Sequence, residues 1–298
     1  MNIQKINIED LDVIYLSYDE PQREKFWIEI QNIVPWARRV DGIKGSDSAH
    51  KAAADASSTE RFILIDGDNL PDPKFFNQQL VLDNTNINAV FRWRALNHIN
   101  GLRYGNGGLS CWTKEFIRNM RTHENTDGKA ETVVEFCFDP NYIAMYDCYS
   151  TTYPNGSPFQ AWRAGFREGV KMSLDRGRRP SVEEFNQAVH ERNYDHLCVW
   201  QSVGRDVDNG QYAIHGARIG TWLTMLTDWD YTQVQDFDLL KELYEKYSQE
   251  PIEPITDLLK SRLGLPILDL DAKQSAFFKH HYTANFKNKG IMTYEIRQ

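Results

Sequence analysis

The chain has 298 residues, of which 41% are hydrophobic and 26% are charged, a composition that excludes fibrous and intrinsically disordered proteins. This length allows either two domains or one elaborated α/β domain. The formal net charge of −8 argues against a protein that coats nucleic acid without sequence preference, because lysine and arginine supply the phosphate contacts.

The first part of the chain alternates short apolar runs with helical patterns. Strands are predicted at residues 13–16, 36–40 and 62–65, and helices at residues 24–34 and 46–56, from β-branched runs and from apolar residues at helical spacing. Parallel strands need crossover connections, so this order predicts a parallel, Rossmann-like sheet. Functional loops then gather at the carboxyl ends of the strands.

The second part of the chain is less regular and richer in helical patterns. A further strand is predicted, then four helices and a basic, aromatic tail, at residues 87–93, 113–120, 158–175, 181–190, 236–247 and 272–298. We therefore expect an α/β fold with a mixed, mostly parallel sheet flanked by helices and a largely helical C-terminal extension. The expected division is a catalytic domain at 1–225 and an extension at 226–298 packed on it.

The most informative motif is Asp66-Gly67-Asp68-Asn69, directly after the predicted strand at 62–65. Two carboxylates at the carboxyl end of a strand can turn toward one hard cation, Mg²⁺ or Mn²⁺, and the glycine lets a diphosphate approach the backbone. An acidic turn without function is the alternative, because a bare D-x-D occurs often by chance.

A glycine-rich segment at residues 104–110 precedes the predicted helix at 113–120. Gly107 and Gly108 would admit a ligand close to main-chain N–H groups, and the following helix start would favour an anion or sugar hydroxyls. A glycine-rich hairpin is the alternative.

The placement of the D-x-D motif resembles the metal-dependent GT-A glycosyltransferases, in which it holds the divalent ion bound to a nucleotide-sugar diphosphate. The resemblance implies donor contacts from Ser17, Tyr18 and Asp19 after the first strand, from Asp41 near the base, and from Asp66. It also places Gly107 and Gly108 beside the donor sugar and the acceptor. Lys51, before the metal strand, would face phosphate, or be a solvated helix lysine.

Most of the chain resembles a narrower group, the glycosyltransferases of tailed bacteriophages, some of which attach sugars to hydroxymethylated pyrimidines in phage DNA. The matching segments are residues 35–40, 49–52, 59–63, 66–69, 104–108, 122–124, 160–171 and 209–218. The resemblance implies a UDP-sugar donor, 5-hydroxymethylcytosine or a sugar already on it as acceptor, double-stranded modified DNA as partner, and the cytoplasm of an infected host cell as location.

Basic residues in the predicted helix at 158–175 partly support a nucleic-acid acceptor. Arg163, Arg167 and Lys171 recur at every fourth position and so share one helix face. Such a stripe could hold a phosphate backbone, with Trp162 and Phe166 nearby to wedge or stack. The alternative is a solvated helix paired with the acidic segment at 228–257.

Two further roles are assigned by position. His215 is favoured as a third metal ligand, because GT-A enzymes often complete the site with a C-terminal histidine; His123 competes, and a core histidine is the alternative. An inverting enzyme needs a carboxylate base for the acceptor hydroxyl, and Glu124, Glu135 and Asp139 are candidates. Glu135 is preferred, since its apolar neighbours would raise its pKa.

These features predict a metal-dependent hexosyl- or pentosyltransferase. Three alternatives stay open: a glycosyltransferase acting on a glycan or small molecule, a sugar nucleotidyltransferase, and a binding protein without turnover. Nucleotidyltransferases usually carry a glycine-rich, basic loop after their first strand, whereas residues 17–21 contain neither glycine nor base. No segment has the roughly 18 apolar residues of a membrane span and no leader precedes the first strand, so we expect a cytoplasmic protein.

Overall fold

The computed structural model describes residues 3–120, 140–285 and 291–294, in two compact units. We call Met1–Asn97, Arg103–Thr126 and Phe136–Tyr153 the sheet unit, and His98–Leu102, Asp127–Glu135 and Pro154–Gln298 the helical unit. The expected boundary near residue 225 differs from this division. It falls within the last turn of a long helix, whose apolar residues share one cluster with those of the C-terminal helices.

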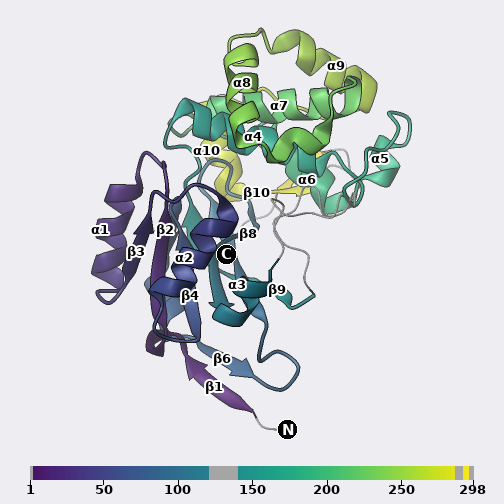
Figure 1. The fold of residues 1–298 in the computed structure, drawn as a ribbon. Helices are drawn as coiled ribbons and strands as arrows, with labels where there is room; N and C mark the ends of the chain where they lie inside the picture. The colour runs from purple at the N-terminus through teal and green to yellow at the C-terminus, as the bar shows by residue number, and fades with distance from the viewer. Residues whose placement is uncertain (1–2, 121–139, 286–290, 295–298) are drawn as a thin grey trace. The chain divides into compact units, whose positions relative to one another are not determined.

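The sheet unit contains a seven-stranded sheet in the order β3-β2-β4-β8-β7-β9-β5 (Figure 1). The strand β2 is parallel to β3 and β4, β8 is antiparallel to β4 and β7, β9 is parallel to β7, and β5 is antiparallel to β9. Five strands therefore run one way, which confirms the mixed, mostly parallel α/β prediction. In sheet order the bounds are Arg38–Asp41, Asp12–Ser17, Arg61–Asp66, Arg103–Thr113, Val90–Asn97, Tyr142–Thr152 and Asn69–Pro71.

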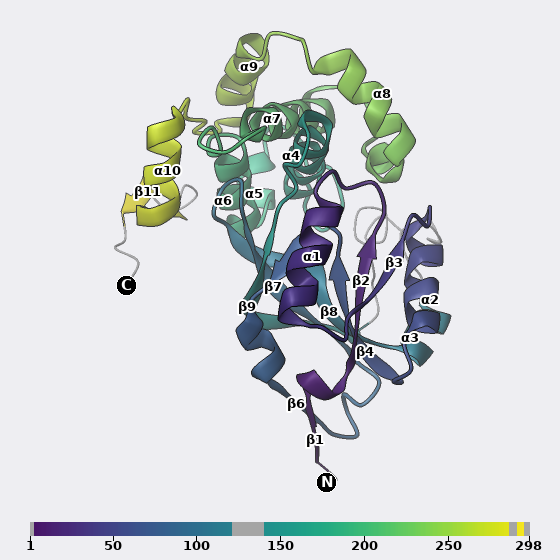
Figure 2. The same ribbon diagram turned by 90° about the vertical axis from the view of Figure 1, so that its left-hand side faces the viewer.

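Helices cover both faces of this sheet, because side chains alternate between faces along each strand. On one face Phe26 and Ile30 of α1 (Arg23–Ile33) join a buried cluster with Ile63 and Ile65. On the other face α2 (Ser46–Ala56) and α3 (Lys114–Asn119) lie side by side (Figure 2). They pack over a second cluster that contains Phe62, Leu64 and Trp112.

Short elements complete the sheet unit. The strands β1 (Gln4–Asn7) and β6 (Gln79–Leu82) form an antiparallel pair, drawn below the main sheet in Figure 1. Two 3₁₀ helices, η1 (Ile8–Asp10) and η2 (Pro73–Asn77), contact each other.

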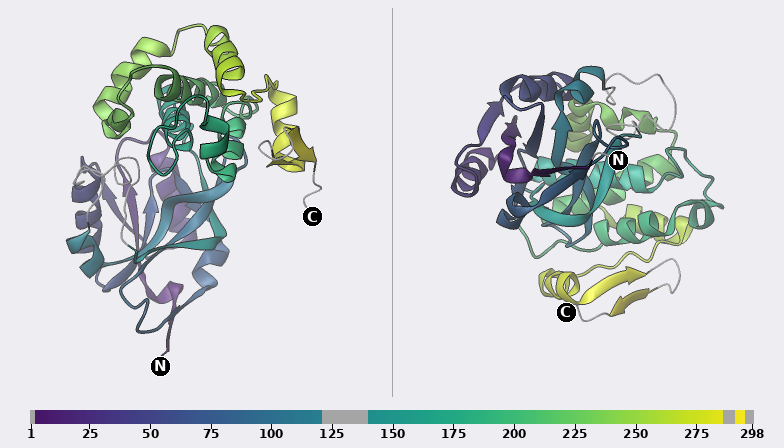
Figure 3. Two further views of the ribbon diagram at one scale, coloured as in Figure 1. Left: turned by 90° about the vertical axis from the view of Figure 1, so that its right-hand side faces the viewer. Right: turned by 90° about the horizontal axis from the view of Figure 1, so that it is seen from below.

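The helical unit is confirmed as the expected helical C-terminal part. Its helices are α4 (Pro158–Met172), α5 (Phe185–Ala188), α6 (Glu191–Trp200), α7 (Gly210–Leu226), α8 (Phe237–Tyr247), α9 (Glu253–Leu263) and α10 (Ala272–His281), with a 3₁₀ helix η5 (Tyr231–Gln235). After α10 the chain forms the antiparallel hairpin β10 (Tyr282–Asn285) and β11 (Ile291–Tyr294), seen in Figure 3.

Glycines bring α4 and α7 into backbone contact. A Cβ at Gly165 or Gly169 would collide with the main chain of α7, and a Cβ at Gly216 or Gly220 with that of α4. Glycines four apart on both helices thus form the contact surface, which side chains would otherwise hold apart. Trp162 and Phe166 of α4 are fully buried and stacked on each other, so the expectation that they wedge into nucleic acid is wrong.

Three local predictions need correction. Residues 104–110, for which no strand was predicted, are part of the long strand β8. The helix expected at 181–190 is reduced to the single turn α5. His215 is in the middle of α7, a helix that was not predicted because its many glycines and β-branched residues obscure its helical pattern.

Candidate functional site

Three carboxylates meet where β4 ends. Asp66 is the last residue of β4, Asp68 follows two residues later, and Glu20 reaches them from the loop after β2. The Glu20 carboxyl group lies against the Cα of Gly67, so that a Cβ at this position would collide with it. The Tyr18 N–H donates to Glu20 Oε2 at 2.8 Å and fixes the side chain there. Sequence reasoning missed Glu20, although the adjacency of β2 and β4 in a parallel sheet brings the two loops together.

The charges in this cluster repel one another. Burial, Asp68 and Glu20 together raise the pKa of the Asp66 carboxyl well above its usual value. Burial also raises the pKa of Glu20, with smaller contributions from Asp68 and Asp19. A divalent cation would relieve this repulsion, and carboxylate oxygens are the ligands that Mg²⁺ and Mn²⁺ prefer. The chemistry of these side chains therefore suits such an ion, although no group of three or more Asp, Glu, His or Cys among the described residues is placed to hold a metal ion.

Neighbouring strands support the motif. The Tyr15 hydroxyl donates to the Gly67 carbonyl at 2.8 Å and thereby fixes the turn between the two aspartates. The Asn69 amide donates to Asp68 Oδ1 at 2.7 Å and accepts from Ser150 at 3.3 Å. Gly108 of β8 lies directly against that amide and leaves no room for a side chain. The structure thus brings Gly108 together with the D-x-D motif.

Ser17 and Asp41, predicted to contact the nucleoside, meet at the carboxyl ends of β2 and β3. The Ser17 hydroxyl donates to Asp41 Oδ1 at 2.6 Å, and Arg39 donates to both residues at 2.9 Å. Burial acts to raise the pKa of Asp41, but the Ser17 and Arg39 hydrogen bonds lower it below its usual value. Arg39 also pairs with Glu24 through two 2.8 Å bonds.

Three other residues that were predicted to contact the donor are exposed to solvent. Two of them, Tyr18 and Asp19, lie in the loop after β2. Lys51 pairs with Asp47 one turn earlier on α2, at 2.6 Å, which is the solvated-helix alternative for this residue. The backbone of Gly107 lies in β8 beside Gly108.

His215 belongs to the helical unit, whereas Asp66 and Asp68 belong to the sheet unit. Trp162 Nε1 donates to His215 Nδ1 at 3.1 Å, so Nε2 carries the proton that faces the Glu250 carbonyl at 3.3 Å. Metal binding would require the histidine to give up one of these bonds. The candidate bases Glu124, Glu135 and Asp139, and the competing ligand His123, lie outside the described residues.

The predicted basic stripe lies on α4, but its cations are engaged within the helical unit. The guanidinium groups of Arg163 and Arg167 stand over the Phe237 ring of α8, at 5.2 and 5.0 Å from its centroid. Lys171 approaches Glu168 at 3.8 Å. All three residues are half-buried, so little of their charge is directed to solvent.

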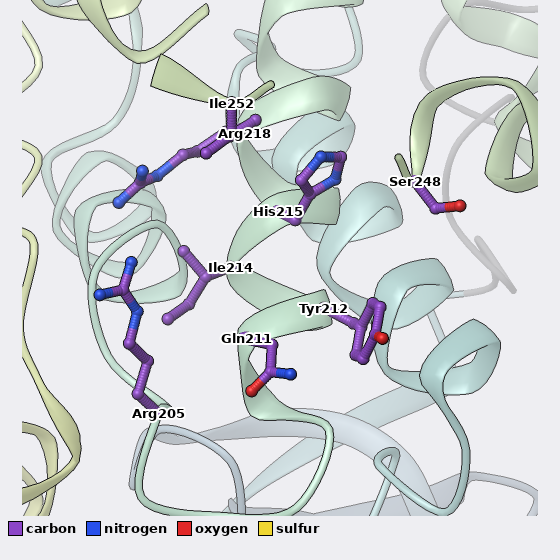
Figure 4. Close-up of a pocket in the computed structure, with 8 residues that line it drawn as sticks. All are labelled: Arg205, Gln211, Tyr212, Ile214, His215, Arg218, Ser248 and Ile252. Carbon is purple, nitrogen blue, oxygen red and sulfur yellow. The ribbon is translucent and has the colours of Figure 1, made fainter. Parts of the chain in front are cut away.

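A cavity of about 260 Å³ opens beside α7 in the helical unit (Figure 4). Tyr212, His215, Arg205 and Arg218 are among the residues that line this cavity. The buried Arg218 donates to the Gln201 carbonyl, Thr256 Oγ1 and Asp269 Oδ1, all at 2.9–3.0 Å. Its charge therefore ties α6, α7 and α9 together.

Comparisons with known proteins give weak likenesses only. No model of a known protein family matches the chain, and no curated protein matches it. Among solved structures it is similar to a glycosyltransferase involved in the glycosylation of the major capsid of PBCV-1, at 16% identity over 47% of this chain and 94% of that one, with a TM-score of 0.29.

It is also similar to HddC from Yersinia pseudotuberculosis, at 15% identity over 51% of this chain and 76% of that one, with a TM-score of 0.27. The inositol-1-phosphate CTP transferase from T. maritima is 14% identical over 50% of this chain and 71% of that one, with a TM-score of 0.28. TM-scores this low assign neither a family nor an activity to the chain. Within the described residues, no helix has the length and apolar character to cross a membrane.

Proposed function

We propose that this protein is a glycosyltransferase that binds a nucleotide-sugar at the carboxyl ends of β2, β3 and β4. The observation that carries the proposal is the carboxylate cluster of Asp66, Asp68 and Glu20, in which burial and the two neighbouring carboxylates raise the pKa of Asp66. Carboxylates whose pKa is raised by burial and by one another are typical of functional sites. They meet at the carboxyl end of β4, and open α/β sheets bind nucleotides at the carboxyl ends of their strands.

The donor has matching groups at its nucleoside and at its diphosphate. Ser17 and Asp41 would orient the nucleoside through hydrogen bonds, and Gly108 makes room for the Asn69 amide that donates to Asp68. Asp66 and Asp68 would hold Mn²⁺ or Mg²⁺, which supplies positive charge for the departing diphosphate. Tyr15 keeps the turn between these aspartates in place. His215 is left out, because both of its ring nitrogens already have partners.

The donor in this proposal is a UDP-sugar, and the acceptor is the hydroxyl of 5-hydroxymethylcytosine in DNA. The acceptor rests on the resemblance to bacteriophage glycosyltransferases over segments that include residues 160–171. One of Glu124, Glu135 and Asp139 would take the proton of the acceptor hydroxyl.

Calorimetric titration of UDP with and without Mn²⁺ tests the donor site. The wild type should bind UDP more tightly with Mn²⁺, and Asp68→Asn should lose that gain, by about 100-fold if the ion contacts the carboxylate directly. Asp55→Asn is the matched control, because it removes an exposed acid from α2 in the same unit. Equal UDP affinity with and without Mn²⁺ in the wild type would contradict the proposal.

Incubation with UDP-sugars and 5-hydroxymethylcytosine DNA tests the reaction. A mass gain on the DNA with release of UDP is the expected result. Transfer to a glycan instead would overturn the DNA acceptor but keep the glycosyltransferase. Formation of a nucleotide-sugar and pyrophosphate from a sugar phosphate and UTP would identify a nucleotidyltransferase.

A further inference from the structure

Two arginines of β7 are stacked on two tyrosines of β9. The Arg92 guanidinium carbon lies 5.2 Å from the Tyr142 ring centroid, and that of Arg94 lies 4.2 Å from the Tyr146 centroid. The strands are parallel neighbours, with register shifts around Arg94. We call these four residues the arginine–tyrosine surface.

The arginine–tyrosine surface lies on the same side of the sheet as Asp66. Phe91 and Trp93 belong to the cluster under α1, so Arg92, between them in β7, points to the opposite face. Tyr142 packs against the cluster on that opposite face, to which Phe62 and Leu64 of β4 belong. Side chains alternate between the two faces along β4, so Asp66 lies on the same face as Phe62 and Leu64. The apolar face under α2 and α3 therefore gives way to charged and aromatic residues toward the carboxyl ends of the strands.

This surface has features of a binding site. The Tyr146 side chain is 79% exposed although it is a large aromatic residue. Arg92 Nε is buried and has no hydrogen-bond partner among the described residues. A Cβ at Gly105 in β8 would collide with the Arg92 guanidinium, so the glycine is what allows the arginine to occupy this place.

The sheet order separates the arginine–tyrosine surface from the nucleoside end of the donor site. Ser17 and Asp41 lie on β2 and β3, to one side of β4, while β8, β7 and β9 follow on the other side. Only β8 stands between β4 and β7, so the Arg92 backbone is about 10 Å from β4, at two strand spacings. If the donor nucleoside occupies the β2–β3 side, a molecule on β7 and β9 approaches the transferred sugar from the acceptor side.

We propose that the arginine–tyrosine surface binds a nucleotide of a nucleic-acid acceptor that has left its base stack. The base would stack on the exposed Tyr146 ring, and the Arg92 and Arg94 guanidinium groups would each donate to a phosphate. Two guanidinium groups that lie over aromatic rings suit a ligand that is both aromatic and anionic, whereas a neutral glycan needs rings alone. The inference rests on the proposed function and specifies its acceptor site.

Equilibrium binding of a fluorescent single-stranded oligonucleotide tests this inference. The probe is about 12 nucleotides long, within the range that single-strand sites span, and contains 5-hydroxymethylcytosine. Tyr146→Ala should weaken binding about tenfold, since stacking of one base is lost. Tyr146→Phe keeps the ring and should restore the affinity, which separates stacking from a folding defect.

The salt dependence of the same binding tests the charge. Arg94→Gln should lower the slope of log affinity against log salt by about 0.7, the value for one phosphate contact on a single strand. Lys246→Gln is the matched control, because it also removes one cation from a cation–π pair, with Tyr247 in α8 at 4.8 Å. The control should leave the affinity and the slope unchanged.

Three results would overturn the inference: affinity equal in wild type, Tyr146→Ala and Arg94→Gln; loss of binding in Tyr146→Phe; or salt-independent binding of a neutral oligosaccharide that Tyr146→Ala abolishes. UDP binding with Mn²⁺, measured on the same wild-type preparation, separates the two proposals. UDP binding without any oligonucleotide binding overturns this inference alone. Oligonucleotide binding that depends on Tyr146, without UDP binding, overturns the proposed donor function and keeps the nucleic-acid site.

Discussion

Each of the two units contains a cluster of charged side chains, and the clusters differ in whether their charges are alike or opposite. In the sheet unit Asp66, Asp68 and Glu20 are all acidic, and burial together with the charges of Asp68 and Glu20 raises the pKa of Asp66. In the helical unit one acid, Asp269, is surrounded by Arg218, Lys260 and Arg205, which hold its pKa below the usual value against the effect of burial. The carboxylates of the first cluster repel one another, whereas in the second cluster the basic side chains offset the charge of Asp269.

From this difference we infer a ligand-binding role for the carboxylate cluster of the sheet unit and a structural role for the cluster around Asp269. Arg218 is only 2% exposed, and a buried guanidinium costs stability unless each of its donors has a partner. Its bonds to Gln201, Thr256 and Asp269 meet that condition, so the cluster needs no ligand. The carboxylates of the sheet unit repel one another, and a divalent cation would relieve that repulsion.

The largest expected effect is on the cluster around Asp269. Arg218→Met should lower the free energy of unfolding by about 3 kcal/mol, because it leaves the buried Gln201 carbonyl and Thr256 Oγ1 without their donor. Chemical denaturation measures it. Arg205→Gln is the control, since Arg205 is exposed and only 3.9 Å from Asp269, and it should cost about 0.5 kcal/mol or less. Equal effects of the two variants would remove the distinction between the clusters.

The helical unit is also held by backbone contact, which a second substitution tests. Gly216→Ala should lower the free energy of unfolding by about 2 kcal/mol, because the new methyl group meets the Trp162 carbonyl and overpacks the α4–α7 contact. Ser261→Thr adds one carbon at an exposed position of α9 and should be nearly neutral. A neutral Gly216→Ala variant would show that the helices can move apart without loss.

The sequence predicted the part of the fold that depends on local periodicity. Residues 12–66 form the expected strand, helix, strand, helix, strand order, because each element there buries one face with a clear period. The strand β8 was not predicted, because Gly105, Gly107 and Gly108 interrupt its strand pattern. In the structure two of these glycines make room for neighbours, Gly105 for Arg92 and Gly108 for Asn69, which no local pattern reveals.

The candidate site also contains residues that could be predicted from the sequence and residues that could not. Asp66 and Asp68 could be predicted because they are close in sequence and follow a buried strand. Glu20 joins them only through the pairing of β2 with β4, and the arginine–tyrosine surface only through that of β7 with β9. Arg163 and Arg167 were placed on the correct helix, but Phe237, which covers them, is about 70 residues away in the sequence.

The smallest expected effect is a gain in stability, and it concerns the carboxylate cluster of Asp66, Asp68 and Glu20. In the absence of divalent ions, Asp66→Asn should raise the free energy of unfolding at pH 8 by about 1 kcal/mol, the size of one repulsive charge pair in a water-like dielectric. The raised pKa of Asp66 means that the folded state binds more protons than the unfolded state. The stability of the metal-free wild type should therefore fall as pH rises from about 4, the unfolded value, through the folded pKa.

Thermal unfolding between pH 4 and pH 8, with EDTA or with Mn²⁺, measures this effect. Wild type and Asp66→Asn should approach each other toward pH 4, where Asp66 is protonated in the folded state and about half protonated in the unfolded state, and diverge as the pH increases. Mn²⁺ should stabilise the wild type by mass action and leave Asp66→Asn unchanged, while Asp55→Asn should behave as the wild type does. If Asp66→Asn instead destabilised the metal-free protein at pH 8, the Asp66 carboxylate would be compensated within the fold. The contrast with Arg218 would then disappear, and the cation site would lose its physical basis.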